Sequence, residues 1–175
     1  MTEEEMKTMV TLGKEEGVIE EEEKEMIHSI FEFGDTVARE VMVPRPDMVC
    51  VKSDSSLKKA LSLIMQAGHS RLPVYQDNLD NIVGIIYAKD VLKYISEGQI
   101  DIELKKVMRP AHWVPETKKL AELLRDLQKR KVHIAIVVDE YGGTAGLVTI
   151  EDLLEEIVGE IFDEYDLEEI MVEHI

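Results

Sequence analysis

The sequence predicts an α/β (α+β) protein in which one unit of small sheets and flanking helices occurs twice about a pseudo-twofold axis, behind acidic N-terminal helices. The first observation is a repeat, because Gly84–Leu92 aligns with Gly146–Leu154 at an offset of 62 residues. The second is that Met42-Val43-Pro44 has a counterpart in Met108-Arg109-Pro110. A period of about 60 residues is longer than that of solenoid repeats. Two copies therefore indicate a tandem pair of domains.

The composition excludes several classes of protein. The chain has 175 residues, 45% of them hydrophobic, which is enough for one or two small domains with their own cores. A net charge of −17 argues against nucleic-acid binding, which depends on Lys and Arg at the phosphates. No apolar run approaches the ~18 residues that a membrane span needs. The single cysteine, Cys50, excludes an internal disulfide framework and fits a reducing compartment.

Residues 1–36 are predicted to form an acidic helical lead-in. Thr2 and Glu5 fit a capping box for a first helix, which Gly17 can end. A second helix is expected over Glu20–Phe33, where apolar residues recur at helical spacing. Its acidic run is interpreted as a solvated face. Divalent-ion binding is the alternative, but the run has no spaced ligand pattern.

The first copy is assigned to residues 37–98. Its expected elements are a strand at Met48–Val51, a helix ending at Gly68, strands at Arg71–Tyr75 and Ile82–Tyr87, and a helix that includes Asp90. The inward face of its first helix is predicted to be Leu57, Ala60, Leu61, Ile64 and Met65.

The second copy is assigned to residues 99–162. Its expected elements are a linker element at Ile100–Lys106, a strand at Trp113–Val114, a helix with Leu120, Leu123, Leu124 and Leu127 inward, a covered strand at Ile134–Val138, a turn at Asp139–Gly143 and a helix from Ile150 towards Glu164. Residues 163–175 are an acidic tail, which we expect to be the start of a truncated C-terminal domain.

Thr149 and Asp152 form a compact pair of acceptors where the last strand meets the last helix. The two carboxylate oxygens of an aspartate can accept hydrogen bonds from both hydroxyls of a ribose. A helix N-terminus also offers free backbone N–H groups to an anion. The same residue types are the commonest helix-capping chemistry, so both interpretations stay open.

The two copies resemble a tandem pair of CBS (cystathionine-β-synthase-type) domains, on the repeated Met-x-Pro, apolar strand and Gly-h-h-x-x-x-Asp. Four segments resemble the CorC/HlyC group more narrowly, namely Val41–Met48, His69–Tyr75, Asp139–Gly146 and Glu155–Ile161. This group comprises hemolysin-like bacterial relatives of the cyclin M magnesium transporters. Its members often carry a transmembrane domain before the pair and a small domain after it. The resemblance, over about residues 18–165, therefore implies an excised part of a membrane protein at the cytoplasmic face of the cell membrane, with residues 1–36 following the missing membrane domain.

The resemblance implies an adenine-nucleotide site between the copies. It places Thr149 and Asp152 at the ribose and Met42-Val43-Pro44 beside the adenine. It directs Arg71, with Ser70 and His69, towards the phosphates, and arginine suits bidentate phosphate contact. Two other interpretations stay open, in which Arg71 is a surface or ion-pair arginine and His69 is a helix-end histidine.

The symmetry-related second cleft departs from the family pattern. Tyr87 stands in place of the Ser or Thr, although Asp90 remains. Its partner-copy residues would be Val132 and His133, with Lys131 nearby, and Met108-Arg109-Pro110 would form a vestigial base wall. Because a tyrosine can fill the space that a ribose or base needs, we expect this second site to be degenerate.

The resemblance implies a regulatory module that binds ATP or AMP, with or without Mg²⁺, and controls an attached Mg²⁺/Co²⁺ transporter. The alternative is a ligand-free homodimerisation scaffold of the same membrane protein, because CBS pairs usually form disc-shaped homodimers. We expect no enzyme, since Cys50 has no evident His partner and no P-loop or dinucleotide fingerprint occurs. We also expect no metal site, because the five His show no metal-ligand spacing.

Overall fold

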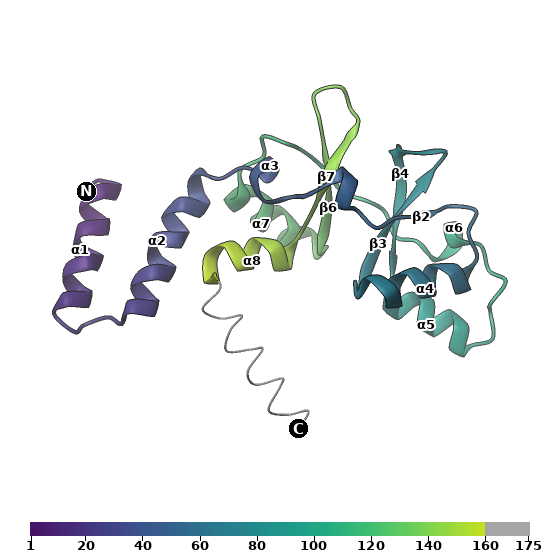
Figure 1. Ribbon diagram of the computed structural model, residues 1–175, viewed down its shortest axis with the longest axis horizontal. Helices are drawn as coiled ribbons and strands as arrows, with labels where there is room; N and C mark the ends of the chain where they lie inside the picture. Colours follow the sequence, from purple (N-terminus) through teal and green to yellow (C-terminus); the bar gives the residue numbers. More distant parts are fainter. Residues whose placement is uncertain (160–175) are drawn as a thin grey trace.

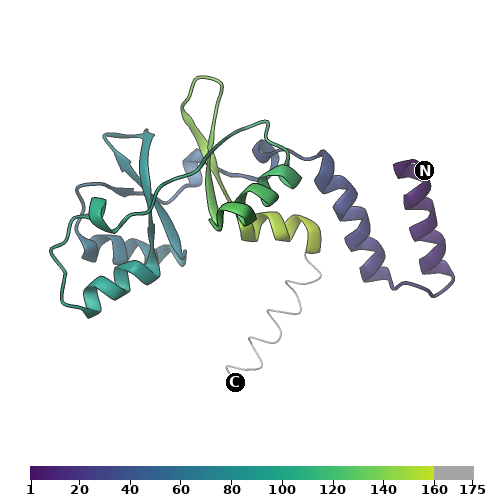
Figure 2. The same cartoon turned by 180° about the vertical axis from the view of Figure 1, so that it is seen from behind.

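The structure is a computed structural model that describes residues 1–159 of the chain. Two small sheets lie side by side, each with helices packed on it, and a pair of helices projects from one end (Figures 1 and 2). The expected continuation of the last helix beyond Gly159, and the acidic tail over 163–175, lie outside the described residues. The predicted fold class, with small sheets flanked by helices, is confirmed.

The elements follow the predicted order, although the strand expected at Met48–Val51 is found at Val51–Lys52 and the strand expected at Ile82–Tyr87 begins at Asn78. The helices are α1 (Glu3–Glu15), α2 (Glu21–Asp35), α3 (Ala38–Val41), η1 (Arg45–Asp47), α4 (Leu57–Ala67), α5 (Ala88–Ser96), α6 (Leu104–Val107), α7 (Leu120–Arg130) and α8 (Ile150–Val158). The strands are β1 (Val43–Pro44), β2 (Val51–Lys52), β3 (Arg71–Gln76), β4 (Asn78–Tyr87), β5 (Trp113–Pro115), β6 (Ile134–Val138) and β7 (Thr144–Thr149).

The register of the two sheets confirms the duplication. The first sheet has the order β2-β3-β4 and the second β1-β7-β6-β5. Val51 lies opposite Val74 in a parallel pair, and Trp113 lies opposite Ile136 in the equivalent parallel pair. Both members of the second pair are displaced by the same 62 residues from the first.

Each Met-x-Pro segment packs on the last strand of the other copy. Val43 lies opposite Leu147 in the antiparallel pair β1–β7, and Arg109 forms an isolated bridge with Ile85. Residues 37–44 therefore belong spatially with the second sheet, and α6 with the first. This exchange ties the two copies together through the backbone.

Two equivalent glycines permit this close approach. A Cβ on Gly84 would lie 2.6 Å from Met108 Sδ, and one on Gly146 would lie 2.9 Å from Met42 Sδ. The Cβ on Gly146 would also overlap the carbonyl oxygen of Val43. Glycine is required at both positions because there is no room for a Cβ, and not because of the backbone conformation, since neither residue has a positive φ.

Three apolar clusters hold the fold. Each copy has its own core, in which Leu57, Ala60 and Ile64 of α4 are the counterparts of Leu120, Leu123 and Leu127 of α7. The third cluster lies between the copies and consists of Ile82, Ile85, Tyr87, Ile134, Ile136 and Leu147. The interface between the copies is therefore itself an apolar core.

The prediction that Met65 faces inward is wrong, because its side chain is 73% exposed. One residue turns a helix by about 100°, so Met65 lies around the helix from buried Ile64, just past the edge of the buried stripe. The covered character of β6 is confirmed, since Ile134–Val137 are all buried.

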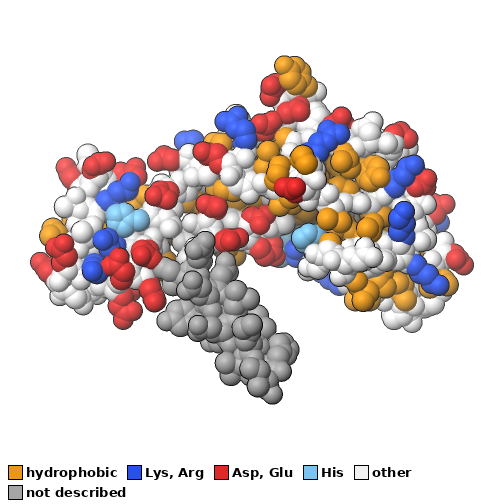
Figure 3. Space-filling view, viewed as in Figure 1, with side chains coloured by type: hydrophobic (Ala, Val, Ile, Leu, Met, Phe, Trp, Pro, Cys, Tyr) orange, Lys and Arg blue, Asp and Glu red, His pale blue; other side chains and the backbone are white. Residues whose placement is uncertain are grey.

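The acidic lead-in is a helical hairpin that touches the body at one end. Thr2 and Glu5 form the predicted capping box, and Gly17 has a φ of 79° just after α1. Only Phe33 of α1 and α2 is buried, in the core of the second copy. Acidic side chains gather over this hairpin, whereas apolar side chains gather over the two sheets (Figure 3). No helix in the described range is long and apolar enough to cross a membrane.

Candidate functional site

A cavity of about 320 Å³ lies where the two copies meet. Its walls come from the β1–β2 connection, the start of β3, and the β7–α8 junction. This volume falls within the ordinary range of small-molecule sites. The apolar part of the wall consists of Val43, Met48, Val49, Ile134 and Leu147.

The structure gathers most of the predicted site residues around this cavity. The predicted residues that line it are Val43, His69, Ser70, Arg71, Thr149 and Asp152. Met42 and Pro44 do not line it. Met42 packs against the core of the second copy beneath Gly146, and exposed Pro44 pairs with that glycine in the sheet.

Sequence reasoning missed several lining residues. Asp47, Met48 and Val49 follow the Met-x-Pro motif after two further residues and reach the cavity because η1 turns the chain there. Glu151 lies in the sequence between Thr149 and Asp152, the two predicted ribose ligands, so its proximity to the site could have been predicted from that position. Ile134 is the 62-residue counterpart of Leu72 and could have been found from the repeat.

The Thr149–Asp152 pair forms a reciprocal helix cap. The Oγ1 of Thr149 accepts a hydrogen bond from the backbone N–H of Asp152 at 3.2 Å. The Oδ2 of Asp152 accepts one from the N–H of Thr149 at 3.0 Å. The capping interpretation is therefore confirmed, and both side chains also line the cavity. Capping fixes the carboxylate at the cavity wall before any ligand arrives.

Arg71 has unused hydrogen-bonding capacity. Its Nε is buried and has no hydrogen-bond partner among residues 1–159. Its Nη1 lies 3.5 Å from Glu151 Oε1, at the outer limit of a hydrogen bond. The guanidinium carbon is also 5.5 Å from the centre of the Tyr87 ring. Arg71 therefore forms an ion pair with Glu151, as one of the two interpretations predicted, and its Nε–H still has no acceptor.

The second cleft is filled by Arg109. Its guanidinium lies 4.3 Å from the centre of the Tyr87 ring and forms two hydrogen bonds with Asp90, at 2.8 and 2.9 Å. The bond to Asp90 raises the pKa of Arg109 further above its ordinary value. Asp90, the counterpart of Asp152, therefore already has a hydrogen-bonding partner. The ring of Tyr87, the counterpart of Thr149, is covered by the same guanidinium.

Two of the predicted second-site residues take no part in this closure. Among the described residues, the side chains of Lys131 and His133 form no hydrogen bond or ion pair with Tyr87 or Asp90. Lys131 ends α7 with a φ of 56°, and the carbonyl of His133 accepts a hydrogen bond from Ile150. The closure comes instead from the middle residue of the second Met-x-Pro segment.

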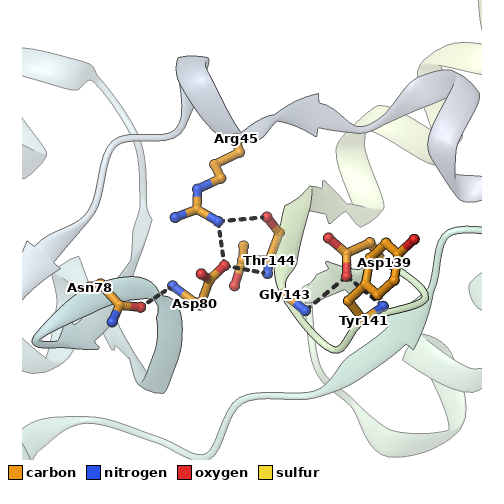
Figure 4. Close-up of polar contacts among 7 residues, drawn as sticks. All are labelled: Arg45, Asn78, Asp80, Asp139, Tyr141, Gly143 and Thr144. Carbon is orange, nitrogen blue, oxygen red and sulfur yellow. Dashed lines mark hydrogen bonds and ion pairs between the residues drawn. The ribbon is translucent and has the colours of Figure 1, made fainter.

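A third polar cluster joins the hairpin tips of the two copies. Asp80 of β4 points between Arg45 and Thr144 (Figure 4). One of its oxygens accepts a hydrogen bond from the backbone N–H of Thr144 at 3.1 Å and forms an ion pair with Arg45. Because η1 begins at Arg45 and ends at the cavity residue Asp47, this cluster braces the cavity wall.

No metal centre is evident within residues 1–159, where no group of three or more His, Cys, Asp or Glu side chains is placed to hold an ion. Burial raises the pKa of the Cys50 thiol to about 11, which disfavours its thiolate.

Comparison with known proteins identifies the family. Residues 38–97 and 102–159 each match the CBS domain. The chain belongs to the CBS domain family. It is, more narrowly, a CBS pair of the CNNM/CorC family, a transporter family rather than an enzyme family.

The relatives are longer proteins. The UPF0053 protein Rv2366c of Mycobacterium tuberculosis is 49% identical over 165 residues, which cover 93% of this chain and 38% of the relative. The magnesium and cobalt efflux protein CorC of Pasteurella multocida is 40% identical over 168 residues, covering 96% and 56%. The chain thus spans between about two fifths and three fifths of these relatives.

Solved CBS pairs share the fold over their whole length. The CBS domain of a bacterial CNNM/CorC family Mg²⁺ transporter has a TM-score of 0.86 and 46% identity, covering 91% of this chain and 98% of that one. The complex of such a domain with ATP has a TM-score of 0.75 and 48% identity, covering 78% and 97%. An AMP-bound CBS pair from Klebsiella pneumoniae has a TM-score of 0.63 and 30% identity, covering 71% and 99%.

Proposed function

We propose that this CBS pair binds one adenine nucleotide, ATP or AMP, in the cavity between its copies. The observation that carries the proposal is the composition of that cavity. It combines the Thr149–Asp152 acceptor pair, an arginine with a buried unpaired donor, and an apolar wall. A sugar, a phosphate and a flat base each find matching chemistry there. The ATP and AMP complexes of similar CBS pairs support the choice of ligand.

The roles follow from position. Asp152 accepts hydrogen bonds from the ribose hydroxyls, and Thr149 holds its carboxylate in place. Val43 and the apolar wall contact the base. Arg71 donates to a phosphate through its terminal Nη atoms, with Ser70 and His69 beside it. The cavity also contains the carboxylates of Asp47, Glu151 and Asp152, so we include Mg²⁺ with the nucleotide as a counter-charge.

Within the parent protein, we propose that the nucleotide controls an attached Mg²⁺/Co²⁺ transport domain from the cytoplasmic face of the membrane. The names of the CorC relatives support the choice of ions. Control requires that the nucleotide bind two conformations with unequal affinity. The cavity can provide this inequality because its walls belong to two copies, whose relative position determines its shape.

The test compares two equivalent aspartates. Calorimetric titration with ATP and AMP, each with and without Mg²⁺, should give one site per chain in the wild type. Asp152→Ala should abolish binding, and Asp90→Ala should leave it largely intact because Asp90 is already paired with Arg109. Asp152→Asn keeps an oxygen for the helix cap and separates lost binding from lost folding. Equal losses from both alanine variants would defeat the one-site assignment.

We further propose that the chain forms homodimers. Apolar side chains stand exposed on the neighbouring helices α4 and α5, with Met65 at 73% and Leu92 at 53%. Sedimentation should give twice the chain mass of 20.0 kDa. If such a dimer forms and no nucleotide binds or raises its melting temperature, the ligand-free scaffold is the function that remains.

A further inference from the structure

Glu151 lines the nucleotide cavity but has no role in holding the ligand described above. It occupies the first turn of α8, between the two residues of the cap. Its Oε1 lies 3.5 Å from Arg71 Nη1. Its side chain is 62% exposed, whereas that of Arg71 is 18% exposed. The carboxylate is therefore the solvent-exposed partner of a largely buried arginine side chain.

The contact between them is weak compared with the ion pair in the closed cleft. Arg109 and Asp90 form two hydrogen bonds at 2.8 and 2.9 Å, which use Nε and one terminal nitrogen. Arg71 and Glu151 form one contact, and Arg71 Nε remains buried without a partner. The first arrangement is a closed pair, and the second leaves room for a better acceptor.

We propose that Glu151 is a built-in competitor for Arg71 that sets the affinity of the cavity for phosphorylated ligands. This inference rests on the proposed function. In the empty site, Glu151 neutralises the guanidinium. A ligand phosphate offers several acceptors to the two terminal nitrogens of Arg71, and so replaces the single long contact with a bidentate one. The nucleotide concentration at half-saturation is therefore higher than it would be in the same cavity without the Glu151 carboxylate.

The competition depends on ligand charge. Once displaced, the Glu151 carboxylate remains a few ångströms from a phosphate and repels it through solvent. A nucleoside without phosphate neither displaces Glu151 nor feels that repulsion. Glu151 therefore weakens the binding of ATP and AMP but not that of adenosine.

The test compares Glu151→Gln with Glu156→Gln in EDTA, so that no divalent cation bridges carboxylate and phosphate. Glu156 is an exposed residue of the same helix that does not line the cavity, and its substitution makes the same change in net charge. Calorimetry with ATP and AMP should show roughly fivefold tighter binding to Glu151→Gln than to Glu156→Gln, as one screened like-charge contact removed implies. Adenosine, followed by ligand-observed NMR, should bind both variants equally.

A double-variant cycle completes the test. In an Arg71→Gln background, Glu151→Gln should improve nucleotide binding over Glu156→Gln by less than it does with Arg71 present, because only the repulsion between Glu151 and the phosphate is then left to remove. Equal affinities of the two glutamate variants for ATP, weaker binding to Glu151→Gln, or an equal gain for adenosine would each overturn the inference. If neither nucleotide binds the wild-type chain in EDTA or in Mg²⁺, the proposed function itself fails. If nucleotides bind and Glu151→Gln has no effect, only the inference fails.

Discussion

Replacing the two equivalent glycines of the repeat by alanine should give unequal losses of stability. A Cβ on Gly146 would overlap the backbone carbonyl oxygen of Val43 and lie 2.9 Å from Met42 Sδ. A backbone group cannot rotate away, so the β1–β7 pair must separate. A Cβ on Gly84 meets mainly the flexible side chain of Met108, at 2.6 and 2.8 Å, with the Arg109 carbonyl oxygen at 3.0 Å.

The magnitudes follow from these contacts. Overpacking costs about 1–3 kcal/mol, and each backbone hydrogen bond lost from β1–β7 costs about 0.5–1.5 kcal/mol. The reduced freedom of the unfolded chain returns about 0.4–1 kcal/mol. Gly146→Ala should therefore lower the free energy of unfolding by about 2–4 kcal/mol. For Gly84→Ala, where the methionine can move, the loss should be nearer 1 kcal/mol.

Urea unfolding followed by far-ultraviolet circular dichroism measures both losses as shifts of the midpoint at constant slope. ATP titration is the second readout. Gly146→Ala displaces Val43 from the cavity wall and should weaken binding, whereas Gly84→Ala acts at the closed cleft and should not. Equal destabilisation by the two substitutions, or a larger loss from Gly84→Ala, would refute the steric reasoning.

Two other predictions concern the brace between the copies and the single thiol. Asp80→Ala leaves the Thr144 N–H without its acceptor and should lower the free energy of unfolding in urea by about 1–3 kcal/mol. The control Asp54→Ala, at a side chain that is 74% exposed, should lower it little. Equal losses from the two variants would contradict the brace. Cys50, with its pKa raised to about 11, should react with iodoacetamide more slowly at pH 8 than in the unfolded chain, at a rate still rising at pH 10; a plateau near pH 9 would contradict the raised pKa.

The local elements were predictable because their signals are local. Apolar spacing located the buried faces of α4 and α7, and the Thr2–Glu5 and Gly17 signals marked the ends of α1. Met65 was misplaced because its side chain lies just past the edge of the buried stripe, where a small angular difference decides exposure.

The site was only partly predictable. The repeat and the family motifs together indicated Thr149, Asp152 and Arg71, which the structure brings to one cavity. They did not indicate that Arg109 would close the second cleft. Tyr87 was the expected obstacle, yet the guanidinium that covers it and pairs with Asp90 arrives from a segment 19 residues further along the chain.

The order of amino acids by itself determined that one unit occurs twice, which faces of α4 and α7 turn inward (apart from Met65), and where a helix cap stands at a strand end. Tertiary structure decided how the Met-x-Pro segments pack on the sheets, and so which side chain closes the second cleft. The physical reason is that the repeat specifies identical local shapes, whereas the exchange of segments places Val43 in one cleft and Arg109 in the other. The short apolar side chain of Val43 leaves space beside Asp152. The long cationic side chain of Arg109 occupies the equivalent space beside Asp90.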